Sequence, residues 1–224
     1  MFLLQVVELS DLPETAVVDA QTITQLAAVP LGQINLFDLD LKPVEERVLA
    51  HPWIREVRLE KHFPQTLSIS VVFREPQALM QAENGSLSYV DTDGRIFGQV
   101  DLMVQSDLPI IASSGLEHIT EALQLIRGWD QSELSKAAQL SLLQWDAERG
   151  FRAQVTYPLA APASPGARGR TFVDLGQDID ARAAKAQFER LSRVFQYLRS
   201  NRVLVRQIWA DAGKKIVVKT ARGS

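Results

Sequence analysis

The sequence predicts an α+β protein made of two domains, and three observations lead to that prediction. The first 74 residues show strand, helix, helix, strand and strand patterns in this order. From residue 75 onward the pattern changes to short strands and tight turns, with two helical segments among them. With 46% hydrophobic and 23% charged residues among 224, the chain has a globular composition and enough apolar mass for two small cores.

The first elements follow from helix start and stop signals. An apolar run at 2–8 has the length of a strand. Asp19 can cap a helix that runs to Val29, before a proline and a glycine stop it. Asp40 can cap a second helix, which ends at His51 because the residue before a proline is pushed out of the α region.

Two strands complete the first domain. Val57 and Leu59 alternate with charged neighbours, and residues 67–73 alternate apolar with polar side chains at a period of two. Pro64 and Gln65 form the turn between these strands. The order therefore predicts two helices on one face of a three-stranded sheet, as a small α+β domain at residues 1–74.

The second domain, residues 75–224, is predicted to be mostly antiparallel β structure with two helices. Asn84-Gly85 and Asp93-Gly94 are hairpin signals, because both turn residues accept a positive φ. The segment 140–145 fits either a helix or a strand, and its position before Gly150 favours a strand. The other strands are expected at 77–81, 87–91, 95–99, 151–157, 171–175, 203–210 and 215–220.

Of the two helices, one is expected over 116–129 and one after Asp180. The second has the most regular pattern in the chain: its apolar residues recur at intervals of four and three, which predicts one apolar stripe facing a core. These residues are Ala184, Phe188, Leu191, Phe195 and Leu198.

Charge is unevenly distributed along the chain. The formal net charge is −3, but residues 181–224 carry +9 and residues 1–180 carry −12. Such an asymmetry fits a basic surface that binds an acidic partner. It fits equally well a solvated helix surface that the acidic remainder of the molecule neutralises.

The sequence lacks the residue patterns that several classes of function require. There is no cysteine, which excludes disulfides and thiolate metal sites. His51, His62 and His118 are not spaced as metal ligands, and Asp91–Gly94 starts like a calcium loop without its later ligands. No nucleophile motif or phosphate loop occurs. We therefore expect no enzymatic activity, no cofactor, no metal and no nucleic-acid partner.

Membrane signals are also missing from the printed sequence. No segment has the roughly 20 mostly apolar residues of a spanning helix, and Met1–Leu4 lacks the basic start of a signal peptide.

Short motifs in a fixed order carry a family resemblance. They are Asn35-Leu36-Phe37, Pro52-Trp53-Ile54, Phe63-Pro64-Gln65-Thr66-Leu67, Pro76-Gln77-Ala78 and Tyr89-Val90-Asp91 with Gly94-Arg95-Ile96-Phe97. In this order and spacing they resemble the extracytoplasmic part of the bacterial cell-division family FtsQ, called DivIB in Gram-positive bacteria. The resemblance implies a POTRA domain at 1–74 and an FtsQ-type β domain at 75–224.

The resemblance also implies a function and a location. FtsQ-like proteins are non-enzymatic scaffolds of the divisome that bind FtsB and FtsL, partly by adding a partner strand to their last strand. Their POTRA domain interacts with upstream division proteins. A cytoplasmic tail and one anchor helix would precede residue 1, so that the chain lies on the periplasmic side of the inner membrane. The alternative is a POTRA-bearing docking protein of outer-membrane transport or assembly.

Two departures from the family pattern restrict what can be carried over. Phe73 stands where the family has a glutamate. Gln207-Ile208-Trp209-Ala210 replaces the family's aspartate-leucine-arginine-tyrosine, so the contacts of that arginine and tyrosine do not transfer.

Charge and resemblance together select ten candidate partner-binding residues near the C-terminus. The final strand is expected at a sheet edge with Ile216 and Val218 facing inward. The sequence does not show which backbone N–H groups face outward, so proline at 217 or at 219 is expected to remove one. The candidates are Arg190, Arg193, Arg206, Trp209, Lys215, Ile216, Val217, Val218, Lys219 and Thr220.

Overall fold

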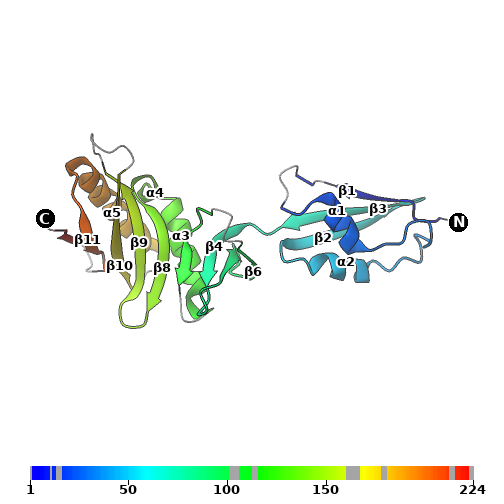
Figure 1. The fold of residues 1–224 in the computed structure, drawn as a ribbon, viewed down its shortest axis with the longest axis horizontal. Helices are drawn as coiled ribbons and strands as arrows, with labels where there is room; N and C mark the ends of the chain where they lie inside the picture. The colour runs from blue at the N-terminus through cyan, green and yellow to red at the C-terminus, as the bar shows by residue number, and fades with distance from the viewer. Residues whose placement is uncertain are drawn as a thin grey trace. The chain divides into compact units, whose positions relative to one another are not determined.

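A computed structural model describes residues 2–10, 12–13, 17–100, 106–112, 116–159, 167–177, 181–211 and 215–221. The chain divides into two compact units, residues 1–75 and 76–224 (Figure 1). Each unit has its own hydrophobic core. The predicted helix cap Asp180 lies outside the described residues.

The N-terminal unit has the predicted order of strand, helix, helix, strand and strand. The sheet order is β1-β3-β2, with β1 parallel and β2 antiparallel to the central strand β3. The elements are β1 (Val6–Ser10), α1 (Ala20–Ala27), α2 (Lys42–Leu49), β2 (Ile54–His62) and β3 (Thr66–Phe73).

Alternation along β3 explains how the helices cover this sheet. Leu67, Ile69 and Val71 are buried in one cluster with Ile23 of α1 and Val48 of α2. The residues between them on β3 belong to the other face and are half-buried or exposed. Both helices therefore cover the same face of the sheet, as predicted from the period of two.

The helix ends differ slightly from the prediction. The carboxylate of Asp19 caps α1 by accepting a hydrogen bond from the N–H of Thr22 at 2.7 Å. The helix ends at Ala27, two residues early, because Ala28 adopts a left-handed conformation. Asp40 is not the N-cap of α2, since that position is Leu41; its carboxylate accepts from the N–H of Lys42 at 3.1 Å.

The C-terminal unit is one mixed sheet with helices. Its strand order is β12-β11-β10-β9-β8-β7-β4-β5-β6. The strands are β4 (Pro76–Gln81), β5 (Leu87–Asp91), β6 (Ile96–Gln99), β7 (Ile110–Ala112), β8 (Gln139–Asp146), β9 (Gly150–Pro158), β10 (Arg168–Gly176), β11 (Val205–Trp209) and β12 (Val217–Thr220). The helices are η1 (Leu116–His118), α3 (Ile119–Asp130), α4 (Leu134–Ala137) and α5 (Ala181–Asn201).

The structure confirms the ambiguous strand and corrects the number of elements. Residues 140–145 lie within β8, as predicted. The strand β7 and the short helix α4 were not predicted, because three or four residues carry too little periodicity to be recognised. The pairs β4–β7, β7–β8 and β10–β11 are parallel, and the other pairs are antiparallel.

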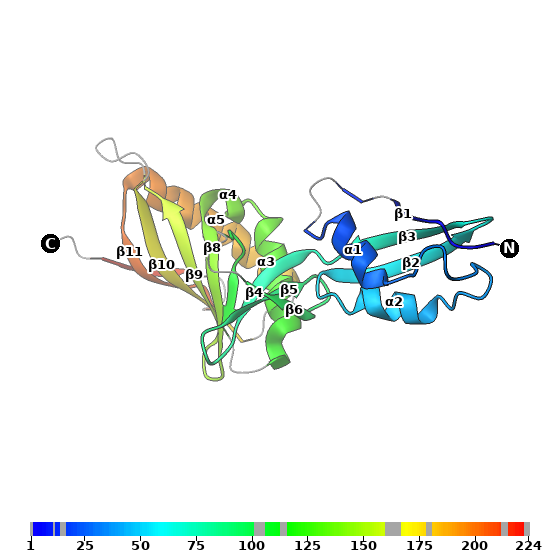
Figure 2. The same ribbon diagram turned by 45° about the vertical axis from the view of Figure 1, so that its right-hand side comes forward.

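The helices of this unit lie on one face of its sheet (Figure 2). The predicted stripe of α5, including Phe188 and Leu191, is buried in one cluster with Trp129 of α3 and with Val173 and Ile208 of the sheet. The opposite face of the sheet carries the side chains that alternate with these strand residues. We call it the uncovered face, because no helix of the described residues lies on it, and it extends to the last strand.

Candidate partner-binding surface

Strand β12 forms one end of the nine-stranded sheet. It pairs antiparallel with β11 on one side, and among the described residues no strand pairs with its other side. It lies at the C-terminal end of the chain (Figure 1). The strand starts at Val217, so Lys215 and Ile216 precede it rather than belong to it as predicted.

The direction of the backbone groups in β12 follows from one hydrogen bond. The N–H of Ala221, just after the strand, donates to the carbonyl of Leu204 at 2.9 Å. In an antiparallel pair, alternate residues direct their N–H and C=O groups toward the same neighbour. Those of Val217 and Lys219 therefore face β11, whereas those of Val218 and Thr220 face the open edge.

This direction overturns the expectation about proline. A proline at 217 or 219 would remove a donor that faces β11, because the outward N–H groups belong to the other two residues of the strand. The sequence alone could not distinguish these cases, since both registers satisfy the same alternation of side chains.

The side chains of β12 alternate as predicted. Ile216 and Val218 pack against the core of the unit. Val217 is 50% exposed, and Lys219 is exposed as well. Val217 and Lys219 therefore belong to the face of the sheet that the helices leave uncovered.

Two rows of side chains cross this uncovered face in register. In the first, Phe172 of β10 lies opposite Gln207 of β11, which lies opposite Lys219. In the second, Asp174 lies opposite Trp209, which lies opposite Val217. Each row ends at the open edge with a residue of β12.

Asp174 holds the two rows together. Its carboxylate accepts from Nε of Arg152 at 2.7 Å and from Nε2 of Gln207 at 2.6 Å. Only 4% of Asp174 is exposed, and a buried polar side chain needs such hydrogen-bond partners. The guanidinium of Arg152 also lies 5.3 Å from the ring centre of Phe172. The surface next to the edge is thus ordered by hydrogen bonds between strands.

Hydrogen bonds from buried polar side chains hold β11 in position, and β12 pairs with β11. Nε2 of Gln187 on α5 donates to the carbonyls of Leu175 and Ala210, both at 2.9 Å. The hydroxyl of Tyr157 donates to the carbonyl of Val203 at 3.2 Å and accepts from the N–H of Val205 at 3.1 Å. Burial raises the pKa of the Tyr157 hydroxyl. Nothing in the local sequence indicated these long-range bonds.

The predicted basic contacts do not share one face. Arg190 and Arg193 lie on α5, which packs on the covered face, while Lys219 lies on the uncovered face. Arg206 is exposed on β11, at an irregularity of the β11–β12 register between Val205 and Gln207. A partner that contacts all four would have to pass around the edge of the sheet.

Trp209 borders a hollow of about 790 Å³ at one end of β10 and β11. Charged side chains of both signs line it, namely Glu148, Arg149, Asp174 and Asp211. Trp209 is half-buried, so part of this residue remains exposed. Aromatic side chains in this position are common anchors at protein interfaces.

In the part of the chain that the structure describes, no three His, Cys, Asp or Glu side chains come together as metal ligands. No helix in the same part combines the length and the apolarity needed to cross a bilayer.

Comparison with known proteins gives matches to one family. Residues 14–73 match the family described as "POTRA domain, FtsQ-type". Three relatives each carry the name "Cell division protein FtsQ". The protein of Geotalea daltonii is 28% identical over 97% of this chain and 76% of its own length. That of Syntrophotalea carbinolica is 26% identical over 84% and 65%, and that of Geobacter sp. (strain M21) is 35% identical over 53% and 41%. The chain thus spans less than two thirds of the second and third relatives.

Proposed function

Because the chain belongs to the FtsQ family of bacterial cell-division proteins, we propose that it is a non-enzymatic scaffold that binds FtsB- and FtsL-like division proteins at the open edge of β12. The observation that carries this proposal is that β12 ends the sheet, with no described strand paired to its outer side. A partner strand would pair there with the outward N–H and C=O groups of Val218 and Thr220.

The uncovered face next to the edge supports the same proposal. In an added strand, alternate side chains would extend the two rows that end at Val217 and Lys219. An apolar side chain fits beside Val217 and Trp209, and an acidic one fits beside Lys219. Affinity would come from the main chain and specificity from these alternate side chains.

The remaining parts of the proposal rest on the family. The chain would lie on the periplasmic side of the inner membrane, held by a single anchor helix before residue 1. Its POTRA domain would interact with upstream division proteins. A docking protein of outer-membrane transport is less well supported, because the matching POTRA family is the FtsQ type.

A proline scan of β12 tests the binding site. Thr220→Pro removes an outward N–H from an exposed residue, and proline is tolerated on an edge strand when its N–H faces away from the sheet. We expect capture of an FtsB-like partner to fall by about tenfold, or 1.4 kcal/mol, with little change in the melting temperature. Lys219→Pro is the matched variant, and it should lower the melting temperature because it breaks a bond to β11.

Two outcomes would contradict the proposed site. If Thr220→Pro stays folded and captures the partner as well as the parent does, the partner binds elsewhere. If Lys219→Pro leaves the melting temperature unchanged while Thr220→Pro lowers it, the assigned direction of the backbone groups is wrong.

A further inference from the structure

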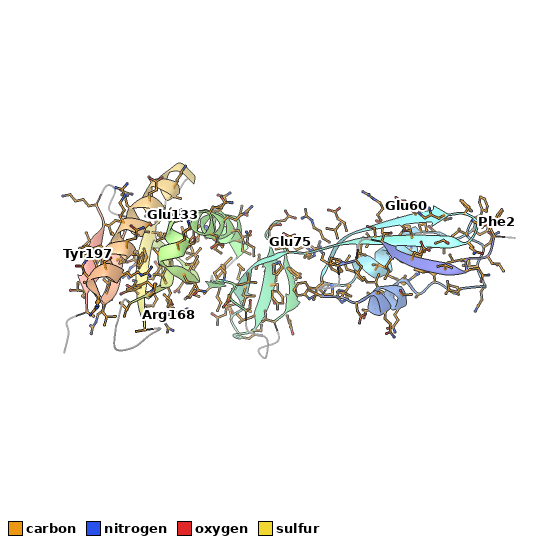
Figure 3. The ribbon with its side chains drawn as sticks, turned by 90° about the horizontal axis from the view of Figure 1, so that it is seen from above. Phe2, Glu60, Glu75, Glu133, Arg168 and Tyr197 are labelled. Carbon is orange, nitrogen blue, oxygen red and sulfur yellow. The ribbon has the colours of Figure 1, made fainter. Side chains whose placement is uncertain are left out.

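A hollow of about 460 Å³ lies on the uncovered face of the C-terminal unit, at the start of β10. It is lined by the beginnings of β7, β8 and β10, by one residue of β9 and by the segment before β7. Its charged lining residues are Arg168, Arg170 and Asp107. We call it the β10 hollow; Figure 3 labels Arg168 on one side of this unit and Glu133, next to α4, on the other. It shares no lining residue with the hollow that Trp209 borders.

Alternation along β10 places both arginines on the uncovered face. Gly169 and Thr171 are buried, whereas Arg168 and Arg170 are exposed. Gly169 packs directly on Tyr157, because a Cβ at that position would lie 2.5 Å from the Tyr157 ring. This close contact fixes the strand. The two guanidinium side chains therefore start from backbone positions about 7 Å apart on the same face.

Neutral polar side chains of the neighbouring strands line the hollow beside the arginines. Nη1 of Arg168 donates a hydrogen bond to Oε1 of Gln139 at 3.4 Å. Thr156 lies opposite Arg170 in the register of β9 and β10, and its hydroxyl oxygen is 3.4 Å from that of Ser141. Hydrogen-bond donors of β8, β9 and β10 therefore line one hollow.

The arginines of this face differ in how their charge is balanced. Arg152 is paired with Asp174 at 2.7 Å. Among the described residues, no carboxylate lies within ion-pair distance of Arg168 or Arg170, although Asp107 lines the same hollow. Two neighbouring like charges repel each other. An anion in the hollow would be attracted by both and would offset that repulsion.

We propose that the β10 hollow binds the phosphate group of a small soluble molecule. A guanidinium pairs two N–H groups with two oxygens of a phosphate, and hydroxyl side chains can donate to the remaining oxygens. A phosphate monoester carries about −1.5 to −2 charges at pH 7, which matches the two uncompensated arginines. The volume of about 460 Å³ lies within the range of about 300–1,000 Å³ that is usual for small-molecule sites.

Isothermal titration calorimetry of the whole chain in phosphate-free buffer tests this site, with inorganic phosphate and glycerol 3-phosphate as probes. We expect saturable binding of both probes. Arg168→Gln and Arg170→Gln should each weaken binding by at least about tenfold, because each removes a charge-assisted contact. Asp107→Asn should strengthen binding by about threefold, the scale of an exposed charge interaction, because it removes a negative charge from the lining.

Arg206→Gln is the matched control, because Arg206 is an exposed arginine of the same unit outside the hollow. It should leave the affinity for both probes unchanged. Melting curves in phosphate-free buffer show whether each variant is folded. A parallel titration in sodium chloride of equal ionic strength separates a defined site from screening of the overall charge.

Three results would overturn the proposal. One is the absence of saturable binding to the folded parent chain at millimolar concentrations of either probe. Another is an equal loss of affinity in Arg206→Gln, or a complete loss in sodium chloride of equal ionic strength, since either would show diffuse attraction. A third is binding only to vesicles that contain phosphatidic acid, which would assign the two arginines to a lipid surface. No division protein is present in this assay, so its result is separate from that of the proline scan.

Discussion

The two sheets of this protein end in strands with different side chains. In the N-terminal unit the edge strand β2 has nine residues, and charged side chains accompany most of its length, including the pair Arg55 and Glu56 at 3.6 Å. In the C-terminal unit the edge strand β12 has four residues, of which only Lys219 is charged. Its exposed neighbour is Val217.

The difference between these two edges favours β12 over β2 for strand addition. Charged side chains along an edge oppose pairing with another chain, because the added strand would bury or crowd them. The edge of β12 lacks most of that protection and lies next to an ordered apolar residue, Trp209. Of these two edges, that of β12 is the one that we propose for strand addition.

The largest effect is expected on the stability of the C-terminal unit, to whose sheet β12 belongs. Phe195 is fully buried with its ring 5.3 Å from that of Tyr157, and Phe195→Ala should cost about 3–5 kcal/mol. Calorimetry should show a lower unfolding temperature for the C-terminal unit. Partner capture should be lost when this unit unfolds.

The matched variant is Leu67→Ala, which removes a fully buried side chain of the other core. It should lower the stability of the N-terminal unit by about 2–5 kcal/mol and spare partner capture at 25 °C. If either variant shifts both transitions equally, the two units do not unfold separately and the comparison fails.

A smaller effect is expected where Tyr157 holds the start of β11. Tyr157→Phe leaves the N–H of Val205 and the carbonyl of Val203 without this partner, which should cost about 1–3 kcal/mol. The pKa of the hydroxyl is raised in the folded state, so its neutral form contributes stability below about pH 10, the unfolded value. That contribution is lost as the pH rises through the folded pKa.

Denaturant unfolding at several pH values checks this prediction. The difference between the parent and Tyr157→Phe should be constant near neutral pH and should shrink above about pH 10. Tyr197→Phe is the control, because Tyr197 is 63% exposed on α5. A difference that persists unchanged at high pH would contradict the role given to the hydroxyl.

A charged side chain placed on β12, like those on β2, tests whether edge charge opposes strand addition. Val217→Lys adds a charge to an exposed position of β12, so the melting temperature should change little. Partner affinity should fall by about tenfold, or 1.4 kcal/mol, because the charge would be crowded by the added strand. Val72→Lys on β3 provides the same change elsewhere, and unchanged affinity for both variants would mean that the uncovered face is not contacted.

The smallest expected effect is at the start of α1. The pKa of the Asp19 carboxyl is lowered chiefly by the hydrogen bond from the backbone N–H of Thr22. Its ionised form therefore stabilises the N-terminal unit above about pH 4, the unfolded value, and this stabilisation is lost as the pH falls through the lowered folded pKa.

Thermal melting across pH tests this contribution. Asp19→Ala should lower the melting temperature of the N-terminal unit at neutral pH and match the parent in acid. Asp19→Asn, which keeps a capping oxygen without the charge, is the control. A pH-independent deficit in the alanine variant would mean that the charge contributes nothing.

Local patterns determined most of the secondary structure. The alternation in 67–73, the stripe of α5 and the two hairpin turns each depend on residues close in sequence, and each was predicted correctly. The turns at Gly85 and Gly94 have φ of 83° and 84°, a conformation that glycine adopts without steric strain. The short elements β7 and α4 were missed because three or four residues show too little periodicity, and the pairing of β7 is with strands far away in the chain.

For the candidate surface, the sequence by itself determined that the last strand has Ile216 and Val218 on one side and that basic residues gather near the C-terminus. Only the tertiary structure decided that β12 lies at the sheet edge, which of its N–H groups face outward, and that Arg193 and Lys219 lie on different faces. The physical reason is that alternation along a strand fixes its two faces locally. Its neighbours and the direction of its backbone groups depend on pairing with residues far away in the chain, here Leu204 and the strand that follows it.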